Sequence, residues 1–434
     1  MYLSTCSTPL SAGSSLHSQN LLQLSSSLKM PGPEHWYADP AAGRYVTVSV
    51  SAVVAASVVT SVSSVTSVSG AGAGVVTVPA SEGRPEGVAF RPEGWDFWEW
   101  DAGPARGGKV RVHFLAMGPA DGPPVILCHG FGASGYHWRY NLPALARAGF
   151  RVYAPCLVGF GWSEKAPDAD YSKGTLWAEQ LAAFAEEVAG ARRDGGDSRR
   201  PVLAGNSLGG YSALRAASRY PDLFRGVCLL NSAGRFEDEL DWSTGTRAGP
   251  AAAASLWAPV RRRLGGAVLR AGLLGAFAVA RQPASIRNTL EKVYVSGIDD
   301  DLVDSIVLPT ADPASPEVFC RVLQANGLGS DNPLSEQRKL TLDPMLRTLR
   351  HRGLPLLLLW GTEDPWIRES KLERIRKTYP EAEKVLVQGG HCPHDDKPHE
   401  VNAALVEWLS RLEAGSAPAP DRGRGGEAAP ACVE

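Results

Sequence analysis

The segment around Ser207 has the residue types of a serine nucleophile. Gly205-Asn206-Ser207-Leu208-Gly209 follows the apolar run 202–204 and leads into a helical pattern that contains Leu214 and Ala217. A G-x-S-x-G sequence between a strand and a helix is typical of a nucleophile on a tight turn. Small neighbours are needed because this turn is strained, and the N-terminus of the following helix favours developing negative charge. The sequence therefore predicts that Ser207 attacks an acyl group.

A glycine-rich loop offers hydrogen-bond donors for that reaction. His129-Gly130-Phe131-Gly132 follows the apolar run 125–128, so its backbone is expected at the same edge of the sheet as Ser207. We expect the amides of Phe131 and Leu208 to form an oxyanion hole. The alternative is a glycine turn without a catalytic part. His129 is expected to hold the loop by side-chain hydrogen bonds rather than to act as a base.

Asp364 is the predicted acid of a catalytic triad. It follows the apolar run 356–360, from where a carboxylate can reach a histidine on the next loop. The alternative is a turn or helix-capping role, because Asp-Pro commonly opens a turn. Glu363, Glu237 and Asp238 are rival acids.

His391 is the predicted base. It lies in Gly389-Gly390-His391-Cys392-Pro393-His394-Asp395, after the run 385–387, and the chain order Ser, Asp, His is the order that this type of fold produces. The flanking glycines permit a tight loop, and His394 is the alternative base. Cys392 with His391 and His394 could also ligate a metal, but no other ligand cluster accompanies them. We expect neither a metal nor a cofactor.

Strand and helix patterns alternate along the middle and the C-terminal part of the chain. Residues 110–116 alternate apolar and polar side chains, which is the period of a half-buried strand. Wholly apolar runs then indicate strands covered on both faces, as in parallel sheets. Helical spacings separate them, as in Trp177, Leu181, Phe184 and Val188. We therefore expect an α/β fold, a doubly wound and mostly parallel sheet with a helical cap insertion. The apolar runs are 125–128, 202–204, 227–230, 356–360 and 385–387.

The same patterns divide the chain. Folded sequence is expected to begin around Trp95, and no buried strand pattern is visible between Gly234 and Leu349. The predicted parts are a transit peptide with a low-complexity disordered region (1–94), the first part of the core (95–234), a helical cap (235–349), the second part of the core (350–413) and a disordered tail (414–434).

The N-terminal region differs in composition from the rest. Residues 1–33 contain many Ser and Leu and no acid, the bias of an organelle transit peptide, although a merely disordered terminus is the alternative. Residues 46–78 are a low-complexity tract of small and β-branched residues, which cannot organise a core.

Composition excludes several classes of function. With a formal net charge of -2 and a pI near 6.5, the chain has no overall positive electrostatic field that would attract nucleic acid. The seven cysteines show no CxxC pair and indicate a reducing compartment. The sequence contains no run of about 18 apolar residues, the length that would indicate a membrane-spanning helix.

Several segments together resemble plastid α/β-hydrolases of plants and algae, in the pheophytinase and chlorophyll dephytylase branch, over roughly residues 95–412. The resemblance implies Ser207, Asp364 and His391 as the triad, Phe131 and Leu208 as oxyanion donors, a chloroplast location and phytyl-ester substrates such as chlorophyll or pheophytin. The chain departs from the pattern at Cys156, where relatives usually have an aspartate that braces a loop. The segments are His137-Trp138-Arg139-Tyr140-Asn141, Leu157-Val158-Gly159-Phe160-Gly161-Trp162-Ser163, Gly205-Asn206-Ser207-Leu208-Gly209-Gly210-Tyr211, Leu229-Leu230-Asn231-Ser232-Ala233-Gly234 and Gly390-His391-Cys392-Pro393-His394-Asp395.

Other functions stay open. An aspartate in place of Ser207 would have indicated an epoxide hydrolase or a dehalogenase that forms an alkyl-enzyme, and Ser207 argues against both. A cofactor-free haloperoxidase or a C–C bond hydrolase would share this triad. A ligand-binding receptor with little turnover and a lipase or acyltransferase for plastid glycerolipids are further alternatives.

The predicted cap combines apolar residues at helical spacing with arginines. The plain interpretation is an apolar face that packs on the sheet edge above Ser207, with the arginines in solvent. The alternative is peripheral contact with the thylakoid membrane, in which arginines meet anionic headgroups while a small hydrophobic ester enters the site. The residues concerned are Trp257, Val260, Leu264, Val268, Leu273 and Phe277 with Arg261, Arg262, Arg263, Arg270 and Arg281.

Overall fold

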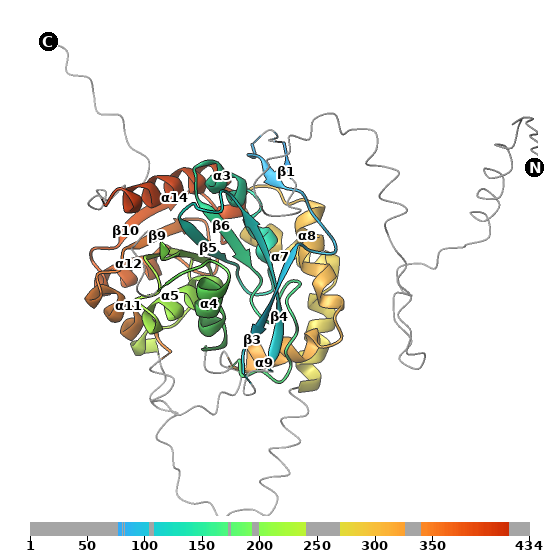
Figure 1. Ribbon diagram of the computed structural model, residues 1–434. Coiled ribbons are helices and arrows are strands. Elements are labelled where there is room, and N and C mark those ends of the chain that lie inside the picture. Colours follow the sequence, from blue (N-terminus) through green and yellow to red (C-terminus); the bar gives the residue numbers. More distant parts are fainter. Residues whose placement is uncertain are drawn as a thin grey trace, which may run out of the picture. The chain divides into compact units, whose positions relative to one another are not determined.

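A computed structural model describes residues 77–79, 81, 83–103, 108–171, 175–192, 199–239, 270–325 and 340–415 (Figure 1). The predicted transit peptide, almost all of the low-complexity tract, the tail beyond residue 415 and the cap residues 240–269 lie outside these ranges. Among the latter are Trp257, Val260, Arg261, Arg262, Arg263, Leu264 and Val268.

The strands are β1 (Thr77–Val78), β2 (Gly87–Val88), β3 (Asp96–Asp101), β4 (Lys109–Met117), β5 (Pro124–Cys128), β6 (Arg151–Pro155), β7 (Val202–Asn206), β8 (Gly226–Leu230), β9 (Leu356–Gly361) and β10 (Glu383–Val387). The α-helices are α3 (Asn141–Arg147), α4 (Thr175–Glu187), α5 (Leu208–Arg219), α7 (Pro283–Val293), α8 (Asp300–Val307), α9 (Ser315–Ala325), α11 (Leu342–His351), α12 (Glu369–Thr378), α13 (Pro393–Asp396) and α14 (Pro398–Glu413), and residues 270–280 are also helical. Short 3-10 helices are η3 (Gly135–Trp138), η5 (Glu237–Glu239) and η6 (Leu308–Ala311).

One mostly parallel sheet of eight strands organises the described chain, in the order β10-β9-β8-β7-β5-β6-β4-β3. The strands from β10 to β6 run parallel, whereas β4 pairs antiparallel with both β6 and β3. Because the parallel strands point the same way, the loops after β5, β7, β8, β9 and β10 meet at one edge of the sheet. Those are the loops that contain the predicted site residues.

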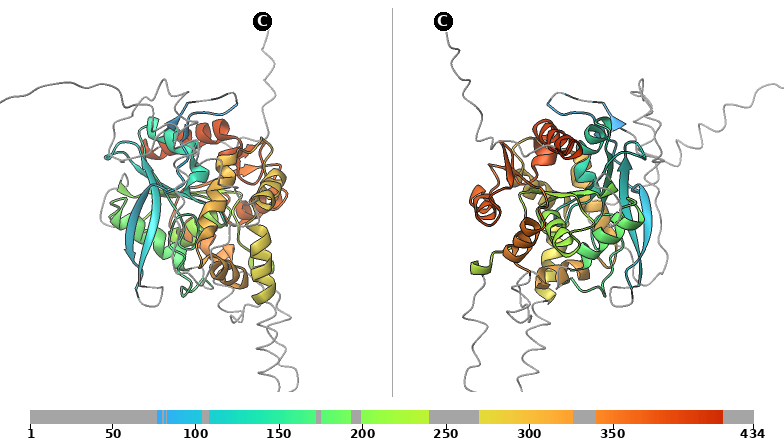
Figure 2. Two further views of the ribbon diagram at one scale, coloured as in Figure 1. Left: turned by 90° about the vertical axis from the view of Figure 1, so that its right-hand side faces the viewer. Right: turned by 60° about the vertical axis from the view of Figure 1, so that its left-hand side comes forward.

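Helices cover both faces of the sheet (Figure 1; Figure 2). One core cluster joins the sheet to α4, α5, α11 and α12, and includes Phe184, Leu214 and Leu346. The cluster on the other face joins it to α3 and α14, and includes Leu145 and Trp408. This confirms the predicted doubly wound fold, in which each face of the sheet is buried under helices.

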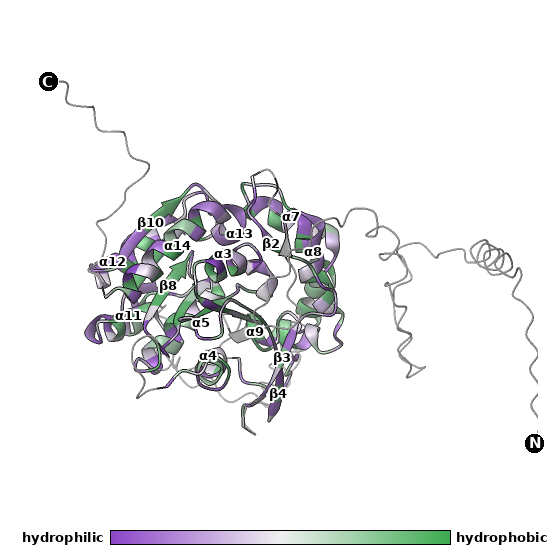
Figure 3. Cartoon of the chain, turned by 45° about the horizontal axis from the view of Figure 1, so that its top comes forward, coloured by the Kyte–Doolittle hydropathy of each residue, from purple (hydrophilic) through white to green (hydrophobic). Residues whose placement is uncertain are grey.

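The central strands follow the predicted burial pattern. Every residue of β5, β7, β8 and β9 is buried, and Figure 3 shows hydrophobic colouring along β8 between helices of mixed colour. Burial of each aliphatic side chain there contributes about 1.5–3 kcal/mol to stability. β10 differs, because it is an edge strand and only its Val387 is buried. The prediction that the run 385–387 is covered on both faces is therefore wrong.

Two strands of the sheet were not predicted. β3 contains three acidic residues, which hide the strand pattern, yet Trp100 is buried and Trp98 packs edge-to-face on Phe184. β6 is short and begins with Arg151. β3 pairs with β4, and β6 pairs with both β4 and β5, so both strands depend on pairing rather than on a long apolar run.

Packing begins earlier in the chain than Trp95, where the sequence analysis placed its start. Val88 is only 1% exposed and its N–H donates to the carbonyl of Arg139 at 2.9 Å. Phe90 packs edge-to-face on Tyr136. The segment before β3 therefore belongs to the folded unit.

The chain between β8 and β9 forms the helical insertion. Helices α7 and α8 share a small core that includes Ile286, Leu290 and Leu302, and Cys392 of the main body packs into it. Leu346 and Leu349 of α11 belong to the main core, as do Val318 and Val322 of α9, so both helices pack on the body of the fold. The division of the whole chain into the predicted parts otherwise stays a prediction.

Cysteines in the described residues are buried and free. They are Cys128, Cys156, Cys228, Cys320 and Cys392. Burial raises the pKa of the Cys128 and Cys228 thiols far above the usual value, so these two side chains serve as small apolar groups in β5 and β8.

Candidate active site

Ser207 lies on a strained turn between β7 and α5. Its φ is 52°, a value rare for a residue with a side chain, and its N–H donates to the carbonyl of Leu230 at 3.0 Å. A Cβ at Gly209 would lie 2.2 Å from the carbonyl oxygen of Cys128, and one at Gly205 would lie 2.4 Å from Gly209. The turn therefore requires glycine at both positions, for the reason that the sequence pattern gave. The side chain of Ser207 lines a cavity.

His391 and Asp364 meet beside the same cavity. His391 Nδ1 lies 2.7 Å from Asp364 Oδ2, and each residue is 5% exposed. Because an ionised carboxylate only accepts, Nδ1 bears the proton and Nε2 is the free nitrogen. His391 also lines the cavity that contains Ser207. The structure thus brings the three predicted triad residues to one place, and their catalytic roles stay a proposal.

Asp364 is held in its ionised form. Its Oδ2 also accepts from the side-chain amide of Asn231 at 2.8 Å, and its Oδ1 accepts from the N–H of Trp366 at 2.7 Å. Burial raises the pKa of Asp364, but the hydrogen bond and charge of His391 and the amides of Ile367 and Trp366 outweigh burial, so the pKa lies below its usual value. A charged Asp364 can stabilise an imidazolium at His391.

Asn231 is a site residue that sequence reasoning missed. It follows β8 with a φ of 41°, donates to Asp364 and accepts from the N–H of Gly361 at 2.8 Å. Asn231 therefore fixes both ends of the β9 loop that presents the acid. Its place directly after a buried strand, at the edge shared with Ser207, was the signal that could have found it.

The rival residues lie elsewhere. The His394 ring is fully buried and stacks on Trp138 with ring centroids 4.0 Å apart, outside the residues that line the cavity. Glu363 is exposed. Asp238 and Glu237 form ion pairs with Arg374 and Arg347.

The glycine-rich loop lies against the elbow. A Cβ at Gly130 would lie 3.4 Å from the Cβ of Ser207, and Phe131 lines the cavity. Leu208 is the first residue of α5, at the helix end that favours negative charge. These positions suit the proposed oxyanion donors.

His129 holds this loop, as predicted. Its Nε2 accepts from the N–H of Leu157 at 2.9 Å, so its Nδ1 bears the proton and donates to the carbonyl of Gly130 at 2.7 Å. Burial lowers the pKa of His129 to about 3, which keeps the ring neutral.

Cys156, at the position of the expected aspartate, makes hydrogen bonds to neighbouring segments through its thiol. The N–H of Gly135 donates to its Sγ at 3.3 Å. His113 Nε2 accepts from Trp95, so His113 Nδ1 donates to Sγ of Cys156 at 3.1 Å. The thiol thus accepts the contacts that brace the loop after β6.

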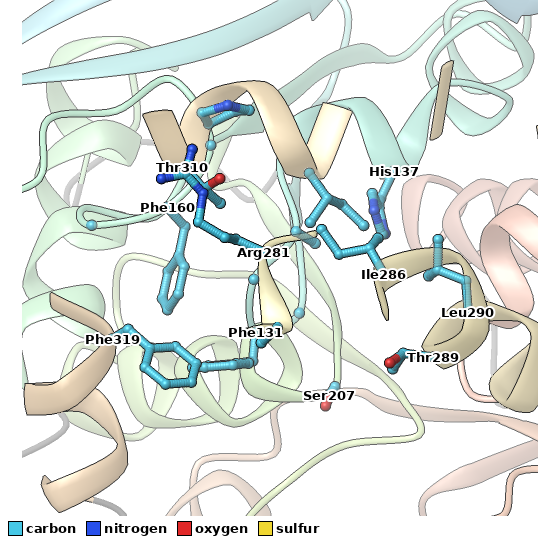
Figure 4. Close-up of a pocket in the computed structure, with 18 of the residues that line it drawn as sticks. Phe131, His137, Phe160, Ser207, Arg281, Ile286, Thr289, Leu290, Thr310 and Phe319 are labelled. Carbon is cyan, nitrogen blue, oxygen red and sulfur yellow. The ribbon is translucent and has the colours of Figure 1, made fainter. Parts of the chain in front are cut away.

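The cavity has a volume of about 370 Å³ (Figure 4). Its wall is mainly apolar, with Phe131, Phe160 and Phe319 on one side of Ser207 and Ile286 and Leu290 of the insertion on the other in this view. Trp366 is 58% exposed at the cavity and packs edge-to-face on the His391 ring. The arrangement suits a hydrophobic molecule with one reacting polar group near Ser207.

The insertion is bonded directly to the His391 loop. The N–H of His391 donates to the carbonyl of Val293, the last residue of α7, at 2.8 Å. The Asp396 carboxylate accepts from the N–H groups of Gly390, Val295 and Ser296. The insertion and the loop that presents the base are therefore one connected unit.

A buried ion network continues this connection. Arg139, 2% exposed, donates from Nε to Asp395 at 2.9 Å and from Nη1 to Asp299 at 2.8 Å. Asp299 caps α8 of the insertion, and Asp395 follows His394 in α13. The Arg139–Asp395 pair is fully buried, and breaking such a pair typically costs about 3–5 kcal/mol, whereas the Asp299 side chain is 43% exposed and its pair contributes less.

Within the described ranges, no group of three or more His, Cys, Asp or Glu could hold a metal ion. None of the helices in these ranges has the length and apolar composition that a membrane span requires.

Comparison with known proteins gave three kinds of match. The family described as alpha/beta hydrolase fold matches residues 123–398. The chloroplastic pheophytinase of Arabidopsis thaliana is 30% identical over 345 residues, which span 71% of this chain and 66% of that protein. Bifunctional epoxide hydrolase 2 of Sus scrofa is 36% identical over 123 residues, 28% of this chain and 20% of that protein. A solved membrane phospholipase A, titled a novel bacterial virulence factor, has a TM-score of 0.50 and 25% identity, with 74% of this chain and 88% of that chain covered.

Proposed function

The chain belongs to the α/β-hydrolase family, and on this premise we propose that it is a serine hydrolase that cleaves carboxylic esters. One observation supports the reaction: Ser207, on its strained turn, and the hydrogen-bonded pair of His391 and Asp364 line one cavity or lie directly behind its wall.

The proposed reaction has two halves. His391 Nε2 takes the proton of Ser207 as its Oγ attacks the ester carbonyl carbon, and the amides of Phe131 and Leu208 stabilise the oxyanion. The imidazolium, stabilised by Asp364, gives this proton to the leaving alcohol. Water, deprotonated by His391, then attacks the acyl-enzyme, and the proton returns to Ser207 as the acid leaves.

The similarity to an epoxide hydrolase does not change this proposal. A serine that opened an epoxide would form an ether, which an activated water molecule does not readily hydrolyse. An ester bond to Ser207 is readily hydrolysed. The chemistry of the side chain at the elbow therefore favours acyl transfer.

For the substrate, we propose a hydrophobic ester of the plastid, such as the phytyl ester of chlorophyll or pheophytin. The mainly apolar cavity and the likeness to a chloroplastic pheophytinase support this assignment and the proposed chloroplast location. We further propose peripheral contact with the thylakoid membrane, although Arg261, Arg262 and Arg263, on which it rested, lie outside the described residues.

A lipid extract provides the test. The full chain and its Ser207→Ala variant are incubated with plastid pigments and lipids, and the products are identified by mass. Release of phytol by the wild-type protein alone would support the assignment. Brisk hydrolysis of short-chain esters without phytol release would reject the phytyl substrate and leave the esterase.

A second candidate is an acyl hydrolase for plastid glycerolipids. The fold similarity to a membrane phospholipase A, at 25% identity, supports this second candidate. Free fatty acids in place of phytol in the same extract would support it.

A further inference from the structure

The cavity that contains Ser207 has two positive side chains and no negative one among its described lining residues. Lys165 and Arg281 line it, and among the described residues no aspartate or glutamate does. We propose that the ester bound here carries an anionic group, a carboxylate or a phosphate, and that Arg281 and Lys165 bind this group away from the scissile bond. The proposal rests on the proposed ester hydrolysis and is an alternative to the phytyl assignment, because the phytyl esters of chlorophyll and pheophytin carry no free carboxylate or phosphate.

Lys165 is the buried member of the pair. It is 6% exposed, and its Nζ donates to the carbonyl of Ser163 at 2.8 Å and to that of Gly161. An ammonium has three N–H groups, so one is left for a ligand. Burial lowers the pKa of Lys165 to about 8, against the opposite influence of Asp312 and Cys156. The side chain thus stays mostly charged at neutral pH in a site that penalises its charge.

Arg281 is the more accessible member. It follows the helical residues 270–280, and in the described chain its guanidinium has neither an ion pair nor a hydrogen bond, only the face of the Phe277 ring at 5.9 Å. Figure 4 shows it across the cavity from Ser207 in this view, on the side of Thr310 and Phe160. Five N–H donors in a fixed fork suit a carboxylate or a phosphate.

Neighbouring acids do not neutralise the cavity. A second pocket of about 430 Å³ shares Lys165 with the first, and Asp312 and Glu164 line only this second pocket. Asp312 accepts from the N–H of Ala314 at 2.8 Å, and Glu164 accepts from the N–H of Arg111 at 3.0 Å. Both carboxylates therefore lie outside the catalytic cavity, and the charge of Asp312 offsets only part of the effect of burial on the pKa of Lys165.

A cation in an apolar wall is costly unless it finds a counter-charge. An anionic ligand removes that cost, and a neutral one of equal length does not. A hydrogen bond to a charged group changes affinity by about tenfold or more. An acidic ester should therefore be preferred over its neutral analogue by at least that factor.

A matched pair of esters tests this preference. We would measure kcat/KM of the full chain for the 4-nitrophenyl monoester of dodecanedioic acid and for the same ester with its free acid methylated. We expect the acid-to-neutral ratio to exceed about ten in the wild type and to fall about tenfold in Arg281→Gln. Lys292→Gln is the control, because this exposed lysine of α7 does not line the cavity. A wild-type ratio near one, or an equal ratio in Arg281→Gln, would overturn the proposal.

A binding measurement separates this proposal from the proposed function. In the Ser207→Ala full chain, monomethyl dodecanedioate should bind at least about tenfold more tightly than dimethyl dodecanedioate by calorimetry. Dodecyl phosphate and dodecanoate, compared in the same way, distinguish a phosphate site from a carboxylate site. Tight binding of the acidic ligand, together with no ester turnover by the wild-type protein, would contradict the proposed esterase and support the anion site. Equal binding of the acidic and neutral ligands, together with ester turnover, would contradict the anion site and leave the esterase. Lys165→Gln, checked for an unchanged Tm because Lys165 is buried, should weaken acidic binding as Arg281→Gln does.

Discussion

The N–H of His391 donates to the carbonyl of Val293 at 2.8 Å, which joins the proposed base to the last residue of α7. The approach is close: a Cβ at Gly390 would lie 1.9 Å from the same carbonyl oxygen. The position of His391 therefore depends on the insertion as well as on the sheet.

Asp396 is expected to position His391 through this contact. Its carboxylate holds Gly390, Val295 and Ser296, so Asp396→Asn leaves an amide N–H₂ facing backbone N–H groups. We expect kcat to fall about 10- to 100-fold with little change in KM, since a small misplacement of a catalytic group has effects of this size. Steady-state kinetics on a short-chain ester check it. Asp304→Asn, an exposed position of α8, is the control, and a rise in KM alone would contradict a positioning role.

Replacement of Ser207 by Ala should remove essentially all acyl hydrolysis, because only binding and the oxyanion hole would remain. His391→Ala should be about as damaging. His394→Ala should chiefly reduce stability, since His394 packs on Trp138 outside the cavity. Activity above about a hundredth of wild type in Ser207→Ala would refute the nucleophile. Reversed effects of the two histidine variants would mean that His394 is the base.

Acid should destabilise the protein through its buried histidines. Burial lowers the pKa of His394 well below 6.5. At mildly acidic pH, His394 is therefore protonated in the unfolded state but not in the folded state. Stability is full above the unfolded pKa of about 6.5 and falls by up to about 1.4 kcal/mol per pH unit below it. The ring nitrogens of His394 have no hydrogen-bond partner in the described chain, so His394→Phe should flatten this fall without loss of a bond. Urea unfolding at pH 7.5 and 5.5 measures it, with His351→Gln at an exposed position as control. An unchanged slope would show that His394 does not contribute.

Gly209→Ala should prevent normal folding or cost more than about 2 kcal/mol, because its Cβ would lie 2.2 Å from the Cys128 carbonyl oxygen. Gly275→Ala is the matched control in helix 270–280, where a Cβ meets nothing within 4 Å. It should stabilise by up to about 1 kcal/mol. Thermal unfolding of both variants measures the difference, and a stable Gly209→Ala protein would contradict the close approach of α5 to β5.

A fusion of residues 1–80 to a fluorescent reporter should enter plastids, because this region is rich in hydroxyl groups and poor in acids. Microscopy of transformed plant cells checks the location. A fusion of residues 34–80 is the control and should stay outside. Cytosolic fluorescence of the longer fusion would contradict the proposed transit peptide.

The fold was predictable where the composition of a single segment indicates a buried strand. β5, β8 and β9 are apolar throughout and β7 is apolar up to Asn206, and a fully buried parallel strand has that composition. β3 and β6 gave no such signal, because β3 contains three acidic residues and β6 is short and begins with Arg151. Their places depend on pairing, of β3 with β4 and of β6 with β4 and β5, which no single segment encodes.

The site was predictable for similar reasons. Ser207, Asp364 and His391 each follow an apolar run, so their place at one sheet edge could be inferred from the sequence. The hydrogen bond between Val293 and His391 joins segments far apart in sequence. It is made by backbone groups, which every residue type has, so the sequence gives no sign of it. Lys165 and Arg281 likewise meet one cavity only through tertiary packing.

The buried thiols of β5 and β8 can report how often the core of the protein opens. Cys128 belongs to the core on one face of the sheet and Cys228 to the core on the other, and burial keeps both as unreactive thiols. An alkylating reagent can reach them only when the central strands separate from their covering helices. The rate at which mass is added at these two positions therefore reports how often the sheet that supports Ser207 comes apart.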